Sequence, residues 1–171
     1  MSPVRDTVMR RLLPLLLLPF LLNQSATCLA QAGSSLERLT GTRAAPGSQV
    51  TFRDASGRAI GTATTNRNGQ TTFRDRSGRV TGTATHSSSG RTTFRDAAGR
   101  TTGTADQRSQ GQTTFRDRSG RTTETASTSR GGVTTFRDAA GRTAGTATAG
   151  RNGNTTFRNR SGRTAGTASA R

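Results

Sequence analysis

A regular spacing of phenylalanines constrains this chain more than any other feature. Beyond residue 45, Phe recurs every 21 residues without insertion or deletion, at Phe52, Phe73, Phe94, Phe115, Phe136 and Phe157. The six units are near-copies of the pattern TFRDxxGRxxGTA. A fixed period of this size indicates a repeat architecture, in which each unit packs against its neighbours. The sequence therefore predicts six repeats over residues 50–171, after a linker at 33–49.

One repeat predicts two short strands and the turn between them. Residues 71–74, Thr-Thr-Phe-Arg, are rich in β-branched and aromatic residues, which favour a strand. The following Asp-x-x-Gly, residues 75–78, suits a type I turn closed by a glycine bulge. Residues 79–85 form the second strand, where alternation places Val80, Gly82 and Ala84 on one face.

A second, more variable turn separates the repeats. A glycine lies four residues before the next Phe in five units, at Gly69, Gly90, Gly111, Gly132 and Gly153. Six repeats then give about a dozen strands and no helix after the N-terminal segment. The fold class is all-β, built from tandem β-hairpins as a solenoid, a β-roll or an extended meander. The sequence does not choose among these three.

The apolar content is low for a folded chain. Trp and Tyr are absent. The large aliphatic residues beyond residue 45 are Val50, Ile60, Val80 and Val133. Low hydrophobicity combined with high net charge is also typical of disorder. We favour an ordered array because the period and turn residues are so regular, and partial disorder is the alternative.

The first 32 residues have the pattern of a secretory signal. Arg5, Arg10 and Arg11 precede an eleven-residue apolar stretch, residues 12–22. This stretch is shorter than the roughly 20 residues that a spanning helix needs. Small residues at Ala30 and Ala32 suit cleavage before Gly33, with cleavage after Ala30 as the near alternative. We therefore expect a cleavable signal helix over 1–32 and a secreted or periplasmic mature chain.

Cys28 is the single cysteine of the chain. It would be acylated if the protein were a lipoprotein cleaved just before it. The preceding Ser25-Ala26-Thr27 departs from the usual lipoprotein pattern, so we favour loss of Cys28 with the signal. The mature chain then has no disulfide.

The string NGQTTFRDRSGRVTGTA resembles the cell-wall-binding repeats of choline-binding and glucan-binding proteins. The matching pieces are Thr72-Phe73, Ser77-Gly78 and Thr81-Gly82, and the resemblance covers residues 50–168. It implies a hairpin solenoid, but those families bind their ligands with Trp and Tyr, so their sites do not carry over. Residues 75–79, DRSGR, are similar to bacterial YD repeats of the Rhs type. Both resemblances imply a bacterial surface or secreted repeat protein.

The residue types for catalysis or transition-metal binding are scarce. His86 is the single histidine and falls in a variable turn, where we expect it to be solvated. No His/Cys cluster offers metal ligands, and we expect no cofactor. The aspartates that recur every 21 residues suit turn capping better than calcium binding, and Asn159 replaces the sixth. We predict a non-enzymatic protein.

The arginines carry the one functional suggestion. All 26 basic residues are arginine, and removal of residues 1–32 leaves 23 arginines against eight acids, a formal charge of +15. Such an excess attracts polyanions through counterion release. The candidate partners are anionic polysaccharide, lipopolysaccharide and extracellular nucleic acid. The alternative is a structural or spacer array with no specific ligand, whose charge keeps it soluble and prevents edge-to-edge pairing.

Nine arginines are the candidate polyanion-binding residues. Six follow the phenylalanines directly: Arg53, Arg74, Arg95, Arg116, Arg137 and Arg158. The other three follow every second turn Asp or Asn, at Arg76, Arg118 and Arg160, where the intervening repeats have Ala55, Ala97 and Ala139. This 42-residue alternation has two interpretations. A two-repeat block was duplicated, or successive repeats face different ways and place the three arginines along one side.

Overall fold

The computed structural model describes residues 48–108 and 111–170, and every repeat within them forms a β-hairpin. The predicted signal segment and most of the predicted linker lie outside these residues. The twelve strands are β1 (Gln49–Asp54), β2 (Ala59–Thr65), β3 (Gln70–Asp75), β4 (Val80–His86), β5 (Arg91–Asp96), β6 (Thr101–Gln107), β7 (Gln112–Asp117), β8 (Thr122–Thr128), β9 (Val133–Asp138), β10 (Thr143–Ala149), β11 (Asn154–Asn159) and β12 (Thr164–Ala170).

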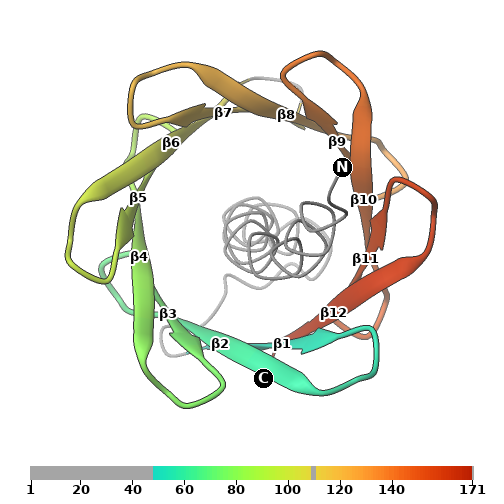
Figure 1. The fold of residues 1–171 in the computed structure, drawn as a ribbon, viewed down its shortest axis with the longest axis horizontal. Coiled ribbons are helices and arrows are strands. Elements are labelled where there is room, and N and C mark those ends of the chain that lie inside the picture. The colour runs from blue at the N-terminus through green and yellow to red at the C-terminus, as the bar shows by residue number, and fades with distance from the viewer. Residues whose placement is uncertain (1–47, 109–110, 171) are drawn as a thin grey trace, which may run out of the picture.

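The strands close into an antiparallel barrel, in which β1 pairs with β2 on one side and with β12 on the other. Figure 1 shows the six hairpins distributed around one ring. The all-β class and the tandem hairpins are confirmed. The order is that of a meander whose two ends pair, whereas a solenoid or an extended meander would leave the terminal strands apart. Closure gives every strand two partners and so removes the free edges.

Each repeat has the same register as the next, including the step that closes the ring. Between hairpins, Gly61 lies opposite Asp75, and the closing pair is Gly166 opposite Asp54. Within each hairpin the register shifts immediately after the phenylalanine, as a β-bulge requires. The barrel therefore has approximate six-fold symmetry, because one local geometry is repeated around the ring.

The bulge corrects one expectation about side-chain direction. Gly82 and Ala84 are buried on the face of Phe73, as alternation predicts. Val80 is 40% exposed, although the same alternation places it on that face. The register shift between Phe73 and Arg74 makes Val80 the partner of Arg74 and so interrupts the alternation.

Phenylalanine and small residues form the core. Phe73 lies opposite Gly82 on one neighbouring strand and Ala63 on the other. The same arrangement recurs around the ring except in the fourth repeat, where Glu124 lies opposite Phe115. Alternation of large and small residues is how a barrel interior accommodates its side chains. Five of the six repeat phenylalanines are buried, and Phe157 is partly buried. The opposite face carries threonine and arginine, so the Phe face lines the interior.

The turn residues explain why the hairpins form where they do. Asp54 Oδ1 accepts hydrogen bonds from the backbone N–H of Ser56 at 2.8 Å and of Arg58 at 3.0 Å. Gly57 then adopts a φ of 80°, a region that glycine enters without strain. The predicted capping role of aspartate is confirmed, and Asn159 makes the equivalent bonds in the sixth turn. Within the described ranges, no helix is long and apolar enough to cross a membrane.

Candidate anion-binding rim

The antiparallel order brings all six Asp/Asn-x-x-Gly turns to one end of the barrel. We call this end the arginine rim; its turns are residues 54–57, 75–78, 96–99, 117–120, 138–141 and 159–162. The variable turns form the far rim. All nine candidate arginines lie on the arginine rim. The antiparallel order places them at one end, and closure then brings the first and last repeats side by side.

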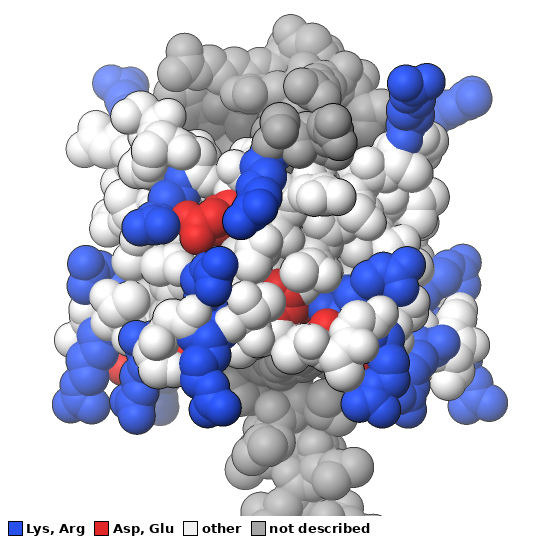
Figure 2. All heavy atoms as spheres, turned by 90° about the horizontal axis from the view of Figure 1, so that it is seen from above, with Lys and Arg blue, Asp and Glu red and all other residues white. Residues whose placement is uncertain are grey.

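The arginine rim is strongly positive. Fifteen of the twenty described arginines lie in its turns or directly beside them, against five aspartates, which gives a net charge of +10. The far rim has five arginines, at Arg67, Arg91, Arg108, Arg130 and Arg151. Figure 2 shows arginines crowded toward one end of the barrel, with fewer near the other. The molecule is therefore polarised along the barrel axis.

Six of the rim arginines, which we call the clamp arginines, bind their own turns. Each donates from Nη1 to the carbonyl oxygen of the turn glycine, at 2.9 to 3.2 Å. They are Arg53, Arg74, Arg95, Arg116, Arg137 and Arg158. A guanidinium has five N–H donors, so each clamp arginine retains donors for a ligand. These candidates therefore have a structural task in addition to any binding.

Three further rim arginines, Arg76, Arg118 and Arg160, are exposed at the second position of their turns, and we call them the tip arginines. Within the described part of the chain, no side-chain hydrogen bond or ion pair is recorded for them. They occupy alternate hairpins around the ring. The interpretation in which successive repeats place them along one side is therefore wrong, because the closed ring distributes them evenly.

The turn aspartates compensate only part of this charge. Their Oδ1 atoms are already engaged with backbone N–H groups, as at Asp96 with Ala98 and Arg100. In the described residues, one ion pair is recorded between a rim arginine and a turn aspartate, from Arg142 Nε to Asp138 Oδ2 at 3.4 Å. At Asp117, a hydrogen bond from Ser119 Oγ, together with the backbone N–H groups, lowers the pKa of the carboxyl. Among the described residues, most rim guanidiniums therefore have no recorded ion pair with a carboxylate.

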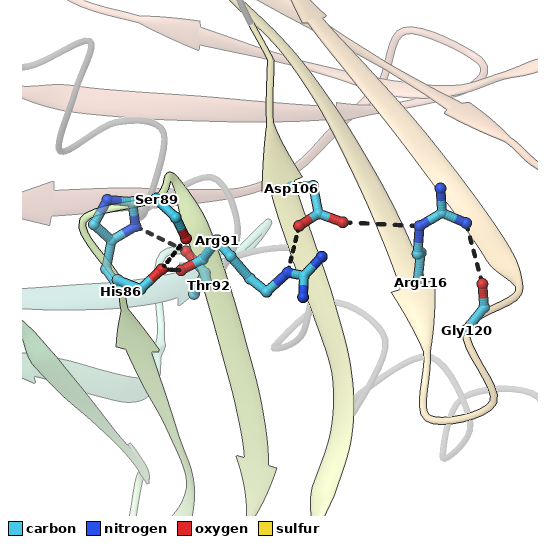
Figure 3. A network of polar contacts seen from close by, with 8 residues as sticks. His86, Ser89, Arg91, Thr92, Asp106, Arg116 and Gly120 are labelled. Carbon is cyan, nitrogen blue, oxygen red and sulfur yellow. Dashed lines mark hydrogen bonds and ion pairs between the residues drawn. The ribbon is translucent and has the colours of Figure 1, made fainter.

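Sequence reasoning missed a polar network on the outer face, shown in Figure 3. Asp106 on β6 lies between two arginines, with Oδ1 at 2.6 Å from Arg91 Nε and Oδ2 at 3.8 Å from Arg116 Nε. The hydrogen bond and charge of Asp106 raise the pKa of Arg91. Arg91 and Asp106 are cross-strand partners, and both depart from the residues of the other repeats. The occurrence of an arginine and an aspartate in the same repeat, at positions where the other repeats have neither, was the sequence signal for this ion pair.

Glu124 was also missed, although it breaks the repeat at a position that is glycine in the other five units. It lies on β8 opposite Phe115, is 7% exposed, and its Oε1 has no hydrogen-bond partner. Burial, followed by repulsion from Asp138, raises its pKa to about 7. On its other side it lies opposite the rim residue Asp138, so it is near the arginine rim but is buried among the residues of the Phe face.

His86 lies at the far rim, where its Nδ1 is 3.1 Å from Thr92 Oγ1. It is exposed, as the sequence predicts, but it has this one polar neighbour. Among the described residues, no group of three or more His, Cys, Asp or Glu side chains is placed to hold a metal ion. The rim arginines are thus the strongest candidate for a binding site.

Comparisons with solved structures include two distant structural likenesses. A protein from Arabidopsis thaliana aligns with 8% identity and a TM-score of 0.49, over 73% of this chain and 80% of its own. BamB from Moraxella catarrhalis aligns with 11% identity and a TM-score of 0.30, over 61% and 60%. No protein-family model matches the chain. No curated protein matches it either.

Proposed function

We propose that this is a secreted, non-enzymatic protein that associates with anionic envelope or extracellular polymers through its arginine rim. The observation that supports this most is the uncompensated charge: fifteen arginines against five aspartates at one end of the barrel. Clustered guanidiniums bind phosphate, sulfate and carboxylate groups through charge-assisted, often bidentate hydrogen bonds. Anionic polysaccharide, lipopolysaccharide and extracellular nucleic acid carry such groups outside the inner membrane.

The salt dependence of polymer binding tests this proposal. We expect the protein to bind single-stranded DNA and a sulfated polysaccharide at about 0.15 M salt, with log affinity falling linearly with log salt concentration. The variant R79Q/R100Q/R121Q removes three exposed rim arginines outside the clamp and tip sets. It should flatten the slope on single-stranded DNA by about 0.7 for each lost phosphate contact. Absence of binding to every polyanion at this salt concentration would overturn the proposal.

The clamp arginines favour a second candidate function, a structural or spacer array with no specific ligand. Their hydrogen bonds to the turn glycines stabilise the hairpins, so arginine is useful at these positions without any partner. On this account, Arg95→Gln lowers thermal stability, while the wild-type protein binds no envelope polymer. Both candidate functions predict that Arg95→Gln lowers thermal stability. Polymer binding by the wild-type protein therefore distinguishes them.

A further inference from the structure

The tip arginines differ from the other rim arginines in their position. They stand at the second residue of a four-residue turn, which is one of the two residues at its apex. Clamp arginines reach back to the turn glycine, whereas the described structure records no side-chain partner for Arg76, Arg118 or Arg160. Their place at the apex therefore lets these three guanidiniums project furthest beyond the turns.

The repeated register sets where these three side chains stand relative to one another. The pairing of Gly82 with Asp96 recurs between all hairpins, and Gly166 with Asp54 closes the ring in the same way. Equivalent turns are therefore at the same height along the barrel axis, and alternate turns are related by about a third of a rotation. The tip arginines thus lie near one plane that is perpendicular to the axis.

A coplanar ring of cations matches a flat anionic surface better than a single polymer chain. A linear chain that crosses the ring can reach two of the three tips, whereas a surface reaches all three and the rim charge behind them. A bilayer that contains anionic lipids presents phosphate groups in such a plane, and each basic residue near it contributes about 1 kcal/mol, or about fivefold in affinity.

We propose that the protein docks end-on, with the arginine rim against the anionic phospholipid headgroups of a bilayer, and that Arg76, Arg118 and Arg160 make the outermost contacts. This inference rests on the proposed function and specifies the ligand and the orientation. The far rim faces away from the bilayer. Strands of six or seven residues place the far rim roughly 15–20 Å further out. Because the Debye length is about 8 Å at physiological salt, the charges of the far rim are largely screened from the bilayer.

The repeats themselves supply the test variants. In R76A/R118A/R160A each tip receives the alanine that the alternate repeats already have at Ala55, Ala97 and Ala139. The matched control, R67A/R130A/R151A, removes the same charge from the same turn position at the far rim. The converse variant, A55R/A97R/A139R, gives all six tips an arginine. Circular dichroism establishes that each variant retains the wild-type β-structure.

Binding is measured by co-sedimentation with vesicles of phosphatidylglycerol and phosphatidylcholine at about 0.15 M salt, with pure phosphatidylcholine as the uncharged reference. We expect the tip variant to lose about 100-fold in vesicle affinity, from three losses of about fivefold each. The far-rim control should lose much less, and the six-tip variant should bind more tightly than wild type.

Three results would overturn the inference. Equal losses in the tip and far-rim variants would show that net charge, and not orientation, drives binding. If wild type binds single-stranded DNA or sulfated polysaccharide but not the anionic vesicles, the bilayer is excluded while the proposed function stands. Failure to bind any of these probes would overturn both.

Discussion

Glu124 is the residue at which this chain departs most from its own repeat. A Cβ at the equivalent glycines would meet a backbone carbonyl of the adjacent strand, as at Gly103 and Arg116. Glu124 nevertheless occupies this position, with Thr113 Oγ1 on the adjacent strand also buried without a partner. Burial of a polar group without a hydrogen bond costs free energy. We therefore expect Glu124 to weaken the fold when it is ionised.

Glu124→Gln should stabilise the protein in a pH-dependent way. Folding raises the pKa of Glu124 from 4.5 to about 7. The ionised form is disfavoured in the folded state, so stability falls as pH rises through this range and then levels off. One pKa unit corresponds to about 1.4 kcal/mol, so Gln should increase the free energy of unfolding at pH 8 by up to about 3 kcal/mol. Near pH 4 the two proteins should be equally stable.

Urea unfolding at pH 4 and pH 8 measures this difference. Asp106→Asn, on the outer face, is the control that removes one carboxylate without relieving burial. A Gln variant no more stable than wild type at pH 8 would show that Glu124 is solvated or paired.

Among individual residues, those that recur in every repeat could be predicted from the sequence, and those that occur in one repeat could not. The positions of the arginines and the capping aspartates were predictable because each follows a fixed offset from Phe. Three residues break the repeat in a single unit each: Arg91, Asp106 and Glu124. Their roles depend on their cross-strand partners, because Arg91 pairs with Asp106 and Glu124 lies opposite Phe115. The register that makes these pairs was not available before the structure.

The hairpin turn is the element that defines each repeat, and its stability depends on one carboxylate oxygen. Asp96 Oδ1 accepts from the N–H groups of Ala98 and Arg100, both at 2.9 Å. Asp96→Ala removes both bonds and should destabilise the protein by about 1–2 kcal/mol in urea unfolding. Asp96→Asn should cost much less, because Asn159 already makes both bonds in the sixth turn. Equal losses for the two variants would mean that charge, and not the hydrogen bonds, is what matters.

Strands and turns were predictable because they depend on local chemistry. The Thr-Thr-Phe segment favours a strand, and the Asp-x-x-Gly segment ends it with a glycine of positive φ. Val80 shows the limit of this reasoning. Its direction follows from a bulge that appears only when two strands are paired.

Across the described strands β1 to β12, closure gives every repeat a neighbour on both sides, and this changes what a core substitution should cost. In an open array, the first repeat has a neighbour on one side only. In the closed barrel, Phe52 is 3% exposed and Phe94 is 5% exposed. We therefore expect Phe52→Ala and Phe94→Ala to destabilise the protein equally, by about 3–5 kcal/mol each. A clearly smaller loss at Phe52, measured by urea unfolding, would indicate an open array.

Closure itself was not predictable from one repeat. Each hairpin makes the same contacts with its neighbours in a meander or in a ring, so local pattern favours neither. Whether the sheet closes depends on the strand twist and the register shift accumulated over six repeats, because together they must bring the last strand beside the first. The position of the arginines on one rim follows from the antiparallel order, but their arrangement as a ring requires closure.

The closed ring is the central claim of this account, and a cross-link between its first and last strands tests it most directly. Thr51 on β1 lies opposite Ser169 on β12, and both are on the outer face. Antiparallel partners have Cα atoms about 4.5–5.5 Å apart, within the range of a disulfide. In an extended meander, eleven strand spacings would separate the two strands by about 50 Å.

The measurement is mild oxidation of T51C/S169C in a Cys28→Ser background, followed by non-reducing electrophoresis and mass spectrometry. The control T51C/T114C joins β1 to β7, six strands away in either direction around the ring. The closed barrel predicts an intramolecular disulfide in T51C/S169C and none in the control. Free thiols or only intermolecular cross-links in a folded T51C/S169C protein would contradict it.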